Sequence, residues 1–88
     1  KLLNMGYWVS EQKKFKNFSA GDHSCKMAVT PNGSVELKDG GNWKVLNELN
    51  GDGSSKIFTA SKVACGTQHT ALAISASNSA VYYYDREN

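Results

Sequence analysis

The chain has 88 residues, a formal net charge of +2 at pH 7 and a hydrophobic content of 40%. This length allows one domain, residues 1–88, with a thin stability margin, and the hydrophobic content excludes an intrinsically disordered chain. The mild charge favours neither nucleic acid nor an anionic membrane as the partner, and no apolar run is long enough to cross a membrane.

The N-terminal part of the chain gives the weakest pattern. Residues 4–9 can form a strand, and residues 11–18 predict one or two helical turns with Ser10 as N-cap. In this segment lysines alternate with phenylalanines, a pattern that can contact phosphates or an anionic surface. The alternative is a solvated lysine face above buried phenylalanines. The candidate binding residues here are Lys13, Lys14 and Lys16.

Residues 26–45 predict a three-stranded antiparallel meander. Three alternating segments, 26–30, 34–38 and 43–46, are separated by the turn sequences TPNG and DGGN. Because side chains alternate across a strand, each segment has one apolar face. We expect one buried face, made of Val29, Val35, Leu37, Trp43 and Val45.

The rest of the chain predicts shorter strands. Residues 47–55 read as a loop, 56–59 as a strand, and 61–66 as a strand or a short helix, followed by strands at 70–75 and 80–85. In the closing strand we expect Val81 and Tyr83 to point inward and Tyr82 and Tyr84 to point outward. The fold class is therefore mostly β: a small antiparallel sheet or sandwich of short strands, with one short helix near residues 11–18.

The two cysteines, Cys25 and Cys65, predict one disulfide. Closing a loop of about forty residues stabilises a domain by roughly 4 kcal/mol in the chain-entropy model. The alternative is a pair of buried thiols in a cytosolic protein. Because no CxxC or HxxxH spacing is present, we expect no metal site, and nothing in the sequence indicates a cofactor.

Secretion is the expected localisation. The chain begins at Lys1 rather than Met, which predicts a mature product whose leader has been removed; a fragment of a longer chain is the alternative. The sequons Asn17-Phe18-Ser19 and Asn32-Gly33-Ser34 are compatible with secretion.

Two segments of the chain, residues 18–39 and 63–85, resemble each other. They share the pairs Gly21 with Gly66, His23 with His69, and Ser24 with Thr70. The stretch VACGTQHTALAI resembles the signature of regulator-of-chromosome-condensation-type β-propeller repeats: an apolar residue, two small residues, Gly, two variable residues, His, Ser or Thr, and an apolar strand.

This resemblance implies propeller blades that bind protein, chromatin or a ligand and have no catalytic role. The first copy departs from the signature, with one residue instead of two between Gly21 and His23, and neither hairpin ends in the Trp-Gly of the family. Two repeats do not close a ring, so such a module would be a fragment or would oligomerise.

Exposed aromatic residues give the main functional hypothesis. Tyr82 and Tyr84, with Trp8 beside them, would supply a large rigid contact area; the alternative is that the tyrosines only cover the sheet. We expect a secreted, non-enzymatic, toxin-like or effector-like protein that binds a protein, glycan or membrane surface, with nucleic acid less favoured.

Two further function classes stay open. One is the propeller-repeat interaction module. The other is a secreted ribonuclease in which His23 and His69 act as base and acid beside a lysine; the alternative for both histidines is a structural role.

Overall fold

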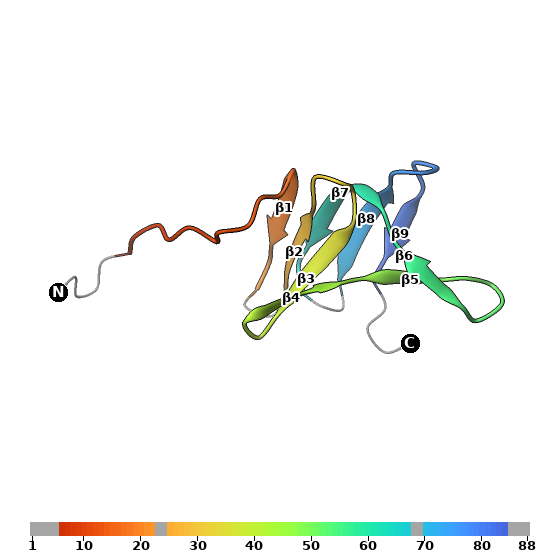
Figure 1. Cartoon of the computed structure of the whole chain (residues 1–88), viewed down its shortest axis with the longest axis horizontal. Coiled ribbons are helices and arrows are strands. Elements are labelled where there is room, and N and C mark those ends of the chain that lie inside the picture. Colours follow the sequence, from red (N-terminus) through yellow and green to blue (C-terminus); the bar gives the residue numbers. More distant parts are fainter. Residues whose placement is uncertain (1–5, 23–24, 68–69, 85–88) are drawn as a thin grey trace.

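The computed structural model describes residues 6–22, 25–67 and 70–84, which form nine short strands and no helix (Figure 1). The strands are β1 (Asn17–Ala20), β2 (Lys26–Val29), β3 (Val35–Asp39), β4 (Asn42–Val45), β5 (Asn47–Leu49), β6 (Ser55–Ile57), β7 (Ala60–Cys65), β8 (Ala71–Ser75) and β9 (Val81–Tyr83). They form an antiparallel sheet β1-β2-β3-β4, a hairpin β5-β6 and an antiparallel sheet β7-β8-β9. The mostly β fold class is confirmed.

The predicted meander is present as β2, β3 and β4, and β1 adds a fourth strand at its edge. The β2–β3 turn needs Gly33, whose φ of 98° lies in the left-handed region that favours glycine. The predicted buried face is confirmed for Val29, Val35 and Leu37, which are all buried in the core.

Trp43 and Val45 lie on the opposite face of this sheet, so their predicted burial beside Leu37 is wrong. The two-residue turn at 40–41 sets Lys38 opposite Trp43 and Glu36 opposite Val45. Residues directly opposite each other in an antiparallel pair share a face. The turn length therefore overrides the phase expected from alternation alone.

The helix predicted over residues 11–18 is also wrong. Residues 10–16, which we call the N-terminal strap, have no regular structure, and β1 begins at Asn17. A helix this short is marginal by itself, whereas β1 gains pairing with β2, and the Phe15 ring lies 4.8 Å from the Trp43 ring. The described part of the predicted strand 4–9, residues 6–9, is irregular too.

Downstream of the first sheet, the predicted loop at 47–55 contains β5 and the start of β6, so that prediction is wrong. The two strands are joined by a turn in which the Ser54 N–H donates to Asp52 Oδ1 at 3.0 Å. Residues 61–66, for which the sequence allowed either a strand or a short helix, belong mostly to the strand β7. The last two predicted strands are present as β8 and β9.

The two sheets are built alike. We call β1–β4 the first unit and β7–β9 the second unit. After the first strand of each unit, a glycine N–H donates to the carbonyl four residues later, from Gly21 to Cys25 at 2.9 Å and from Gly66 to Thr70 at 3.1 Å. In both turns the last residue also donates its N–H to the carbonyl of the residue after the glycine. These bonds run from Cys25 to Asp22 and from Thr70 to Thr67, each at 3.1 Å.

The second turn of each unit is also shared. Asn32 Oδ1 accepts from the Ser34 N–H at 3.4 Å, and Asn78 Oδ1 accepts from the Ala80 N–H at 2.9 Å. The residue between each pair has positive φ, 98° at position 33 and 61° at position 79. The first and second units are therefore structural repeats within one chain.

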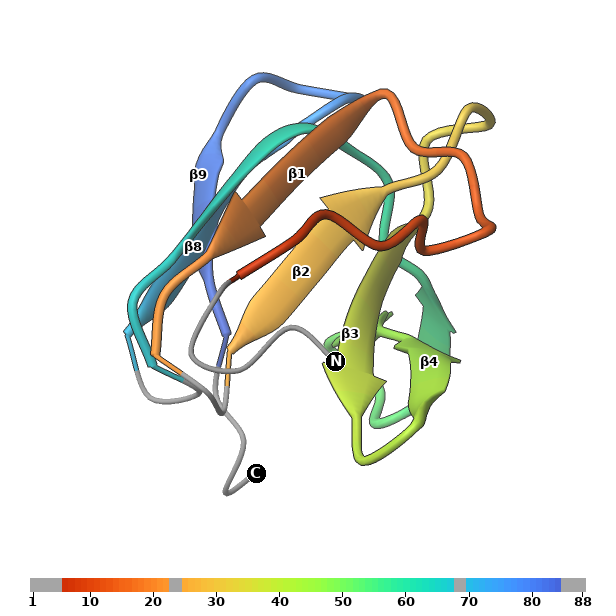
Figure 2. The ribbon, with the colours of Figure 1, turned by 90° about the vertical axis from the view of Figure 1, so that its left-hand side faces the viewer.

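The second unit packs on the first through β7, which lies against β1 and β2 (Figure 2). Asn17 Oδ1 accepts a hydrogen bond from the Val63 N–H at 3.1 Å, and Ser19 Oγ accepts one from the Cys65 N–H at 2.9 Å. Side chains of β1 thus satisfy backbone donors of β7. One core cluster spans both units: Cys25, Met27, Val29, Val35, Leu37, Leu46, Phe58, Ala60 and Ala71.

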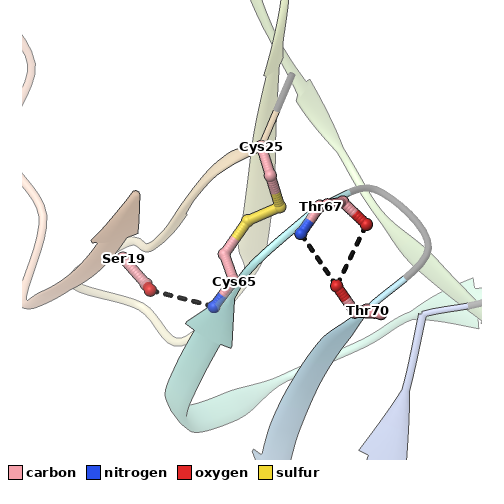
Figure 3. The surroundings of a disulfide bond; sticks show 5 residues. All are labelled: Ser19, Cys25, Cys65, Thr67 and Thr70. Carbon is pink, nitrogen blue, oxygen red and sulfur yellow. Dashed lines mark hydrogen bonds between the residues drawn. A yellow bond between two sulfur atoms is a disulfide. The ribbon is translucent and has the colours of Figure 1, made fainter. Parts of the chain in front are cut away.

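The predicted disulfide joins Cys25 of the first unit to Cys65 of the second, with Cα atoms 6.0 Å apart (Figure 3). Beside it, the Asp22 N–H donates to the Gly66 carbonyl at 2.8 Å. A Cβ on Gly21 would collide with the carbonyl oxygens of Cys65 and Gly66. Glycine is therefore required for the two turns to approach this closely.

Candidate binding groove

An apolar groove of about 570 Å³ opens between the two units, bordered by β4 and β5 on one side and by β9 on the other. This volume lies within the range of about 300–1,000 Å³ that is usual for small-ligand pockets. Its apolar and aromatic lining includes Met27, Val35, Leu46, Phe58, Ala73, Tyr82 and Tyr84. The groove can therefore bury several side chains of a binding partner.

Tyr82 and Tyr84 line this groove and do not point outward, so their predicted orientation is wrong. Both are half-buried and pack against the core, while Val81 and Tyr83 are the exposed residues of β9. The Tyr82 ring lies 5.0 Å from the ring of Phe58. The binding role of the two tyrosines stays a prediction.

The register of β8 explains this inward phase. Ala73 is opposite Tyr82, and the larger Leu72 is opposite Tyr83. The small side chains of β8 leave room on the core side, and the tyrosine rings fill it. Large rings beside small neighbours pack a core well, so the bulkier residues of β8 turn to solvent.

The rim of the groove includes residues that the sequence did not single out as binding residues. Leu49 of the β5–β6 hairpin is 71% exposed and lines the groove, as does Val45 at the end of β4. In the same hairpin, Lys56 Nζ lies 3.7 Å from Glu48 Oε1, and Glu48 also lines the groove. An apolar residue in a mostly polar hairpin was the available signal for Leu49.

The other predicted site residues lie away from the groove. Residues 6–16 run from the side of the molecule away from β9 (Figure 1). Trp8 is fully exposed and does not line the groove. Lys14 and Lys16 are exposed, and Lys13 pairs with Glu36 on the outer face of the first unit. The structure therefore does not join the lysines or Trp8 to the tyrosines.

The N-terminal strap covers the outer face of the first unit through polar and aromatic contacts. Lys38 Nζ donates to Glu11 Oε1 at 2.8 Å, and the Trp43 Nε1–H donates to the same oxygen at 3.1 Å. Beneath the strap the Phe15 ring meets the Trp43 ring, and Ala28 is completely buried. The strap therefore caps this side of the sheet.

We expect the Glu11 contact to be lost at acid pH. The hydrogen bond from Lys38, and then that from Trp43, lowers the pKa of Glu11 below its ordinary value. A lowered folded-state pKa stabilises the folded protein above the ordinary carboxyl pKa, and this contribution disappears as pH falls through the lowered value. In a Trp8→Phe background, Trp43 fluorescence should change with a midpoint below the ordinary glutamate pKa.

Glu11→Gln is the matched control for this titration, because it removes the carboxylate and keeps the side-chain shape. Its Trp43 fluorescence should lack that transition. An identical transition in Glu11→Gln would show that another group titrates.

His23 and His69 lie outside the described residues, so the ribonuclease hypothesis stays a prediction. Within residues 6–22, 25–67 and 70–84, no group of three or more His, Cys, Asp or Glu side chains is placed to hold a metal ion. The same part of the chain contains no helix long and apolar enough to cross a membrane.

No protein-family model, curated protein or solved structure matches this chain. The resemblance to regulator-of-chromosome-condensation-type repeats therefore stays a prediction, and the proposals below rest on the geometry of the two units.

Proposed function

We propose that this chain is a secreted, non-enzymatic binding protein whose groove takes an extended apolar segment of a partner protein. The observation that carries this proposal is the groove between the two units, with Phe58, Tyr82 and Tyr84 on its wall. Aromatic rings in a cleft supply much contact area and lose little rotamer freedom on binding. Apolar side chains of a protein fit this lining better than a glycan, which needs many polar partners.

The strands beside the groove support an extended ligand. β4 and β9 are the outermost strands of their sheets within the described residues, and both border the groove. An outermost strand can pair with the backbone of an added strand, while alternate side chains of that strand enter pockets. We therefore propose a peptide with apolar residues at every second position.

Secretion is part of the same proposal. The Cys25–Cys65 disulfide supports it, because disulfides persist in oxidising compartments and are rare in the cytosol. The toxin-like or effector-like character stays a prediction from the sequence.

A peptide-display selection tests the groove. From a library of random peptides, the wild-type chain should select peptides with apolar residues at every second position. Leu49→Glu should weaken their binding at least tenfold, because it places a charge on the groove rim. Isothermal titration with the selected peptides measures this loss.

Ile57→Glu is the matched control. Ile57 is an exposed apolar residue of the same hairpin, and it does not line the groove. It should leave peptide affinity nearly unchanged. Equal binding by the wild type and Leu49→Glu, or selected peptides without apolar residues, would rule out the groove as the binding site.

The internal repeat favours a second candidate, an interaction module of a repeat protein. The shared hydrogen bonds of the turns at Gly21 and Gly66 support it. Units of repeat proteins contact mainly their neighbours and present a combined surface for binding.

A further inference from the structure

The second unit exposes an apolar face, whereas the equivalent face of the first unit is buried. In the first unit this face lies against the second unit and comprises Met27, Val29, Val35 and Leu37, each no more than 2% exposed. The equivalent residues of the second unit, between 38% and 74% exposed, are Leu72, Ile74, Val81 and Tyr83. We call these four residues, with Lys62 and Ala64, the open face.

Strand pairing shows that the two faces are equivalent position by position. Within the buried face of the first unit, the β2 residues Met27 and Val29 are opposite Leu37 and Val35 of β3. Within the open face, the equivalent β8 residues are opposite the equivalent β9 residues: Leu72 with Tyr83 and Ile74 with Val81. Both faces therefore present four apolar side chains in the same cross-strand arrangement.

The contact between the units joins unlike faces. The second unit uses the face that carries Ala73, Tyr82 and Tyr84, which is opposite to its open face. A contact between different faces of like units is head-to-tail, and it leaves one face without a neighbour at each end. Each further unit can then add by the same geometry.

The two ends of this chain differ. At the first unit the end face is covered by the strap, through the pairs Lys13–Glu36 and Lys38–Glu11 and through the Phe15 and Trp43 rings. At the second unit the end face is the open face, and its four apolar residues remain accessible. Terminal repeats need a cap on their outer face for solubility, and within the described part of the chain only the first unit has one, the strap.

We infer that the open face binds a further β unit of the same kind, stacked as the second unit stacks on the first. The incoming unit presents small residues on its second strand and two large rings on its third, as the second unit does with Ala71, Ala73, Tyr82 and Tyr84. This inference deepens the repeat-module candidate, on which it rests. Leu72 and Tyr83 of the open face also line the groove, so the two proposals share these residues.

One difference sets the strength of this contact. Asn17 and Ser19 accept hydrogen bonds from β7, and the equivalent open-face residues are Lys62 and Ala64, which offer no acceptor. The added unit is therefore held mainly by apolar packing. The double substitution Lys62→Asn and Ala64→Ser should restore both acceptors and tighten the contact.

An extended chain tests the inference directly. Residues 1–85 are followed by residues 40–88, so that the added unit follows the second unit as the second follows the first. Thr70→Cys in the original second unit places a thiol at the position equivalent to Cys25. We expect it to form a disulfide with Cys65 of the added unit, in most molecules, as detected by peptide mass mapping under oxidising conditions.

Four variants of the extended chain, each changed in its original copy, separate this result from chance pairing. Ser77→Cys in place of Thr70→Cys puts the thiol in the β8–β9 turn and should leave it unpaired. Val81→Glu on the open face should remove most of the new disulfide, and Lys62→Asn with Ala64→Ser should increase its yield. Leu49→Glu, the groove variant, should leave the yield unchanged, which separates stacking from peptide binding.

The original Cys25–Cys65 bond reports whether the first two units have folded. If it forms while the added cysteine stays reduced, the open face does not select a like unit and the inference is wrong. Loss of the original bond in the extended chain, but not in the 88-residue Thr70→Cys chain, would also overturn it, because the added unit would then prefer the first unit's buried face.

Discussion

Replacing Leu37 by alanine should lower the free energy of unfolding by about 2–4 kcal/mol. Leu37 is completely buried in the cluster that joins both units, so the shorter side chain loses apolar burial and leaves a cavity. For a chain of 88 residues this is a large part of the total stability. Urea unfolding followed by circular dichroism measures the loss.

Leu49→Ala is the matched control, because it makes the same chemical change at a side chain that is 71% exposed. It should cost less than about 0.5 kcal/mol, as surface substitutions usually do. Similar losses for both variants would mean that the described packing of Leu37 is incorrect.

Removing the disulfide should have an effect of similar size. The bond closes a loop with a sequence separation of 40 residues, and chain-entropy theory assigns such a loop roughly 4 kcal/mol. It also joins the two units at their closely packed turns, so its loss lets them separate. The double variant Cys25→Ala and Cys65→Ala should therefore be largely unfolded or strongly destabilised in urea titrations.

Reduction of the wild-type chain is the control, since it breaks the bond without removing the sulfur atoms from the core. Reduction should produce most of the stability loss that is expected for the double cysteine variant. Alkylation of both cysteines in the folded chain before reduction would show that the bond does not form.

Strand positions in the middle of the chain were predictable because turn residues and alternation agreed. The TPNG turn, with Gly33 in the left-handed region, fixed the β2–β3 hairpin, and Val29, Val35 and Leu37 took the expected face. The inverted phase of Trp43 was also readable in principle. A two-residue turn at 40–41 necessarily sets Lys38 opposite Trp43.

The phase of β9 was not readable from its own residues, because consecutive tyrosines provide no alternation. It is decided by β8, where Ala71 and Ala73 face the core and Leu72 faces solvent. The usual rule that the larger apolar residues point inward fails here. The groove itself depends on how two separately paired sheets meet, and local sequence patterns do not carry that information.

The strap that covers the first unit is held by two kinds of contact that respond oppositely to ionic strength. Dissolved ions screen the partly exposed pairs Lys13–Glu36 and Lys38–Glu11 and weaken them. Sulfate and similar salts strengthen apolar contacts, such as that between Phe15 and Trp43. The two responses offset each other, so the attachment of the strap is buffered against changes in such salts while it remains sensitive to protons at Glu11.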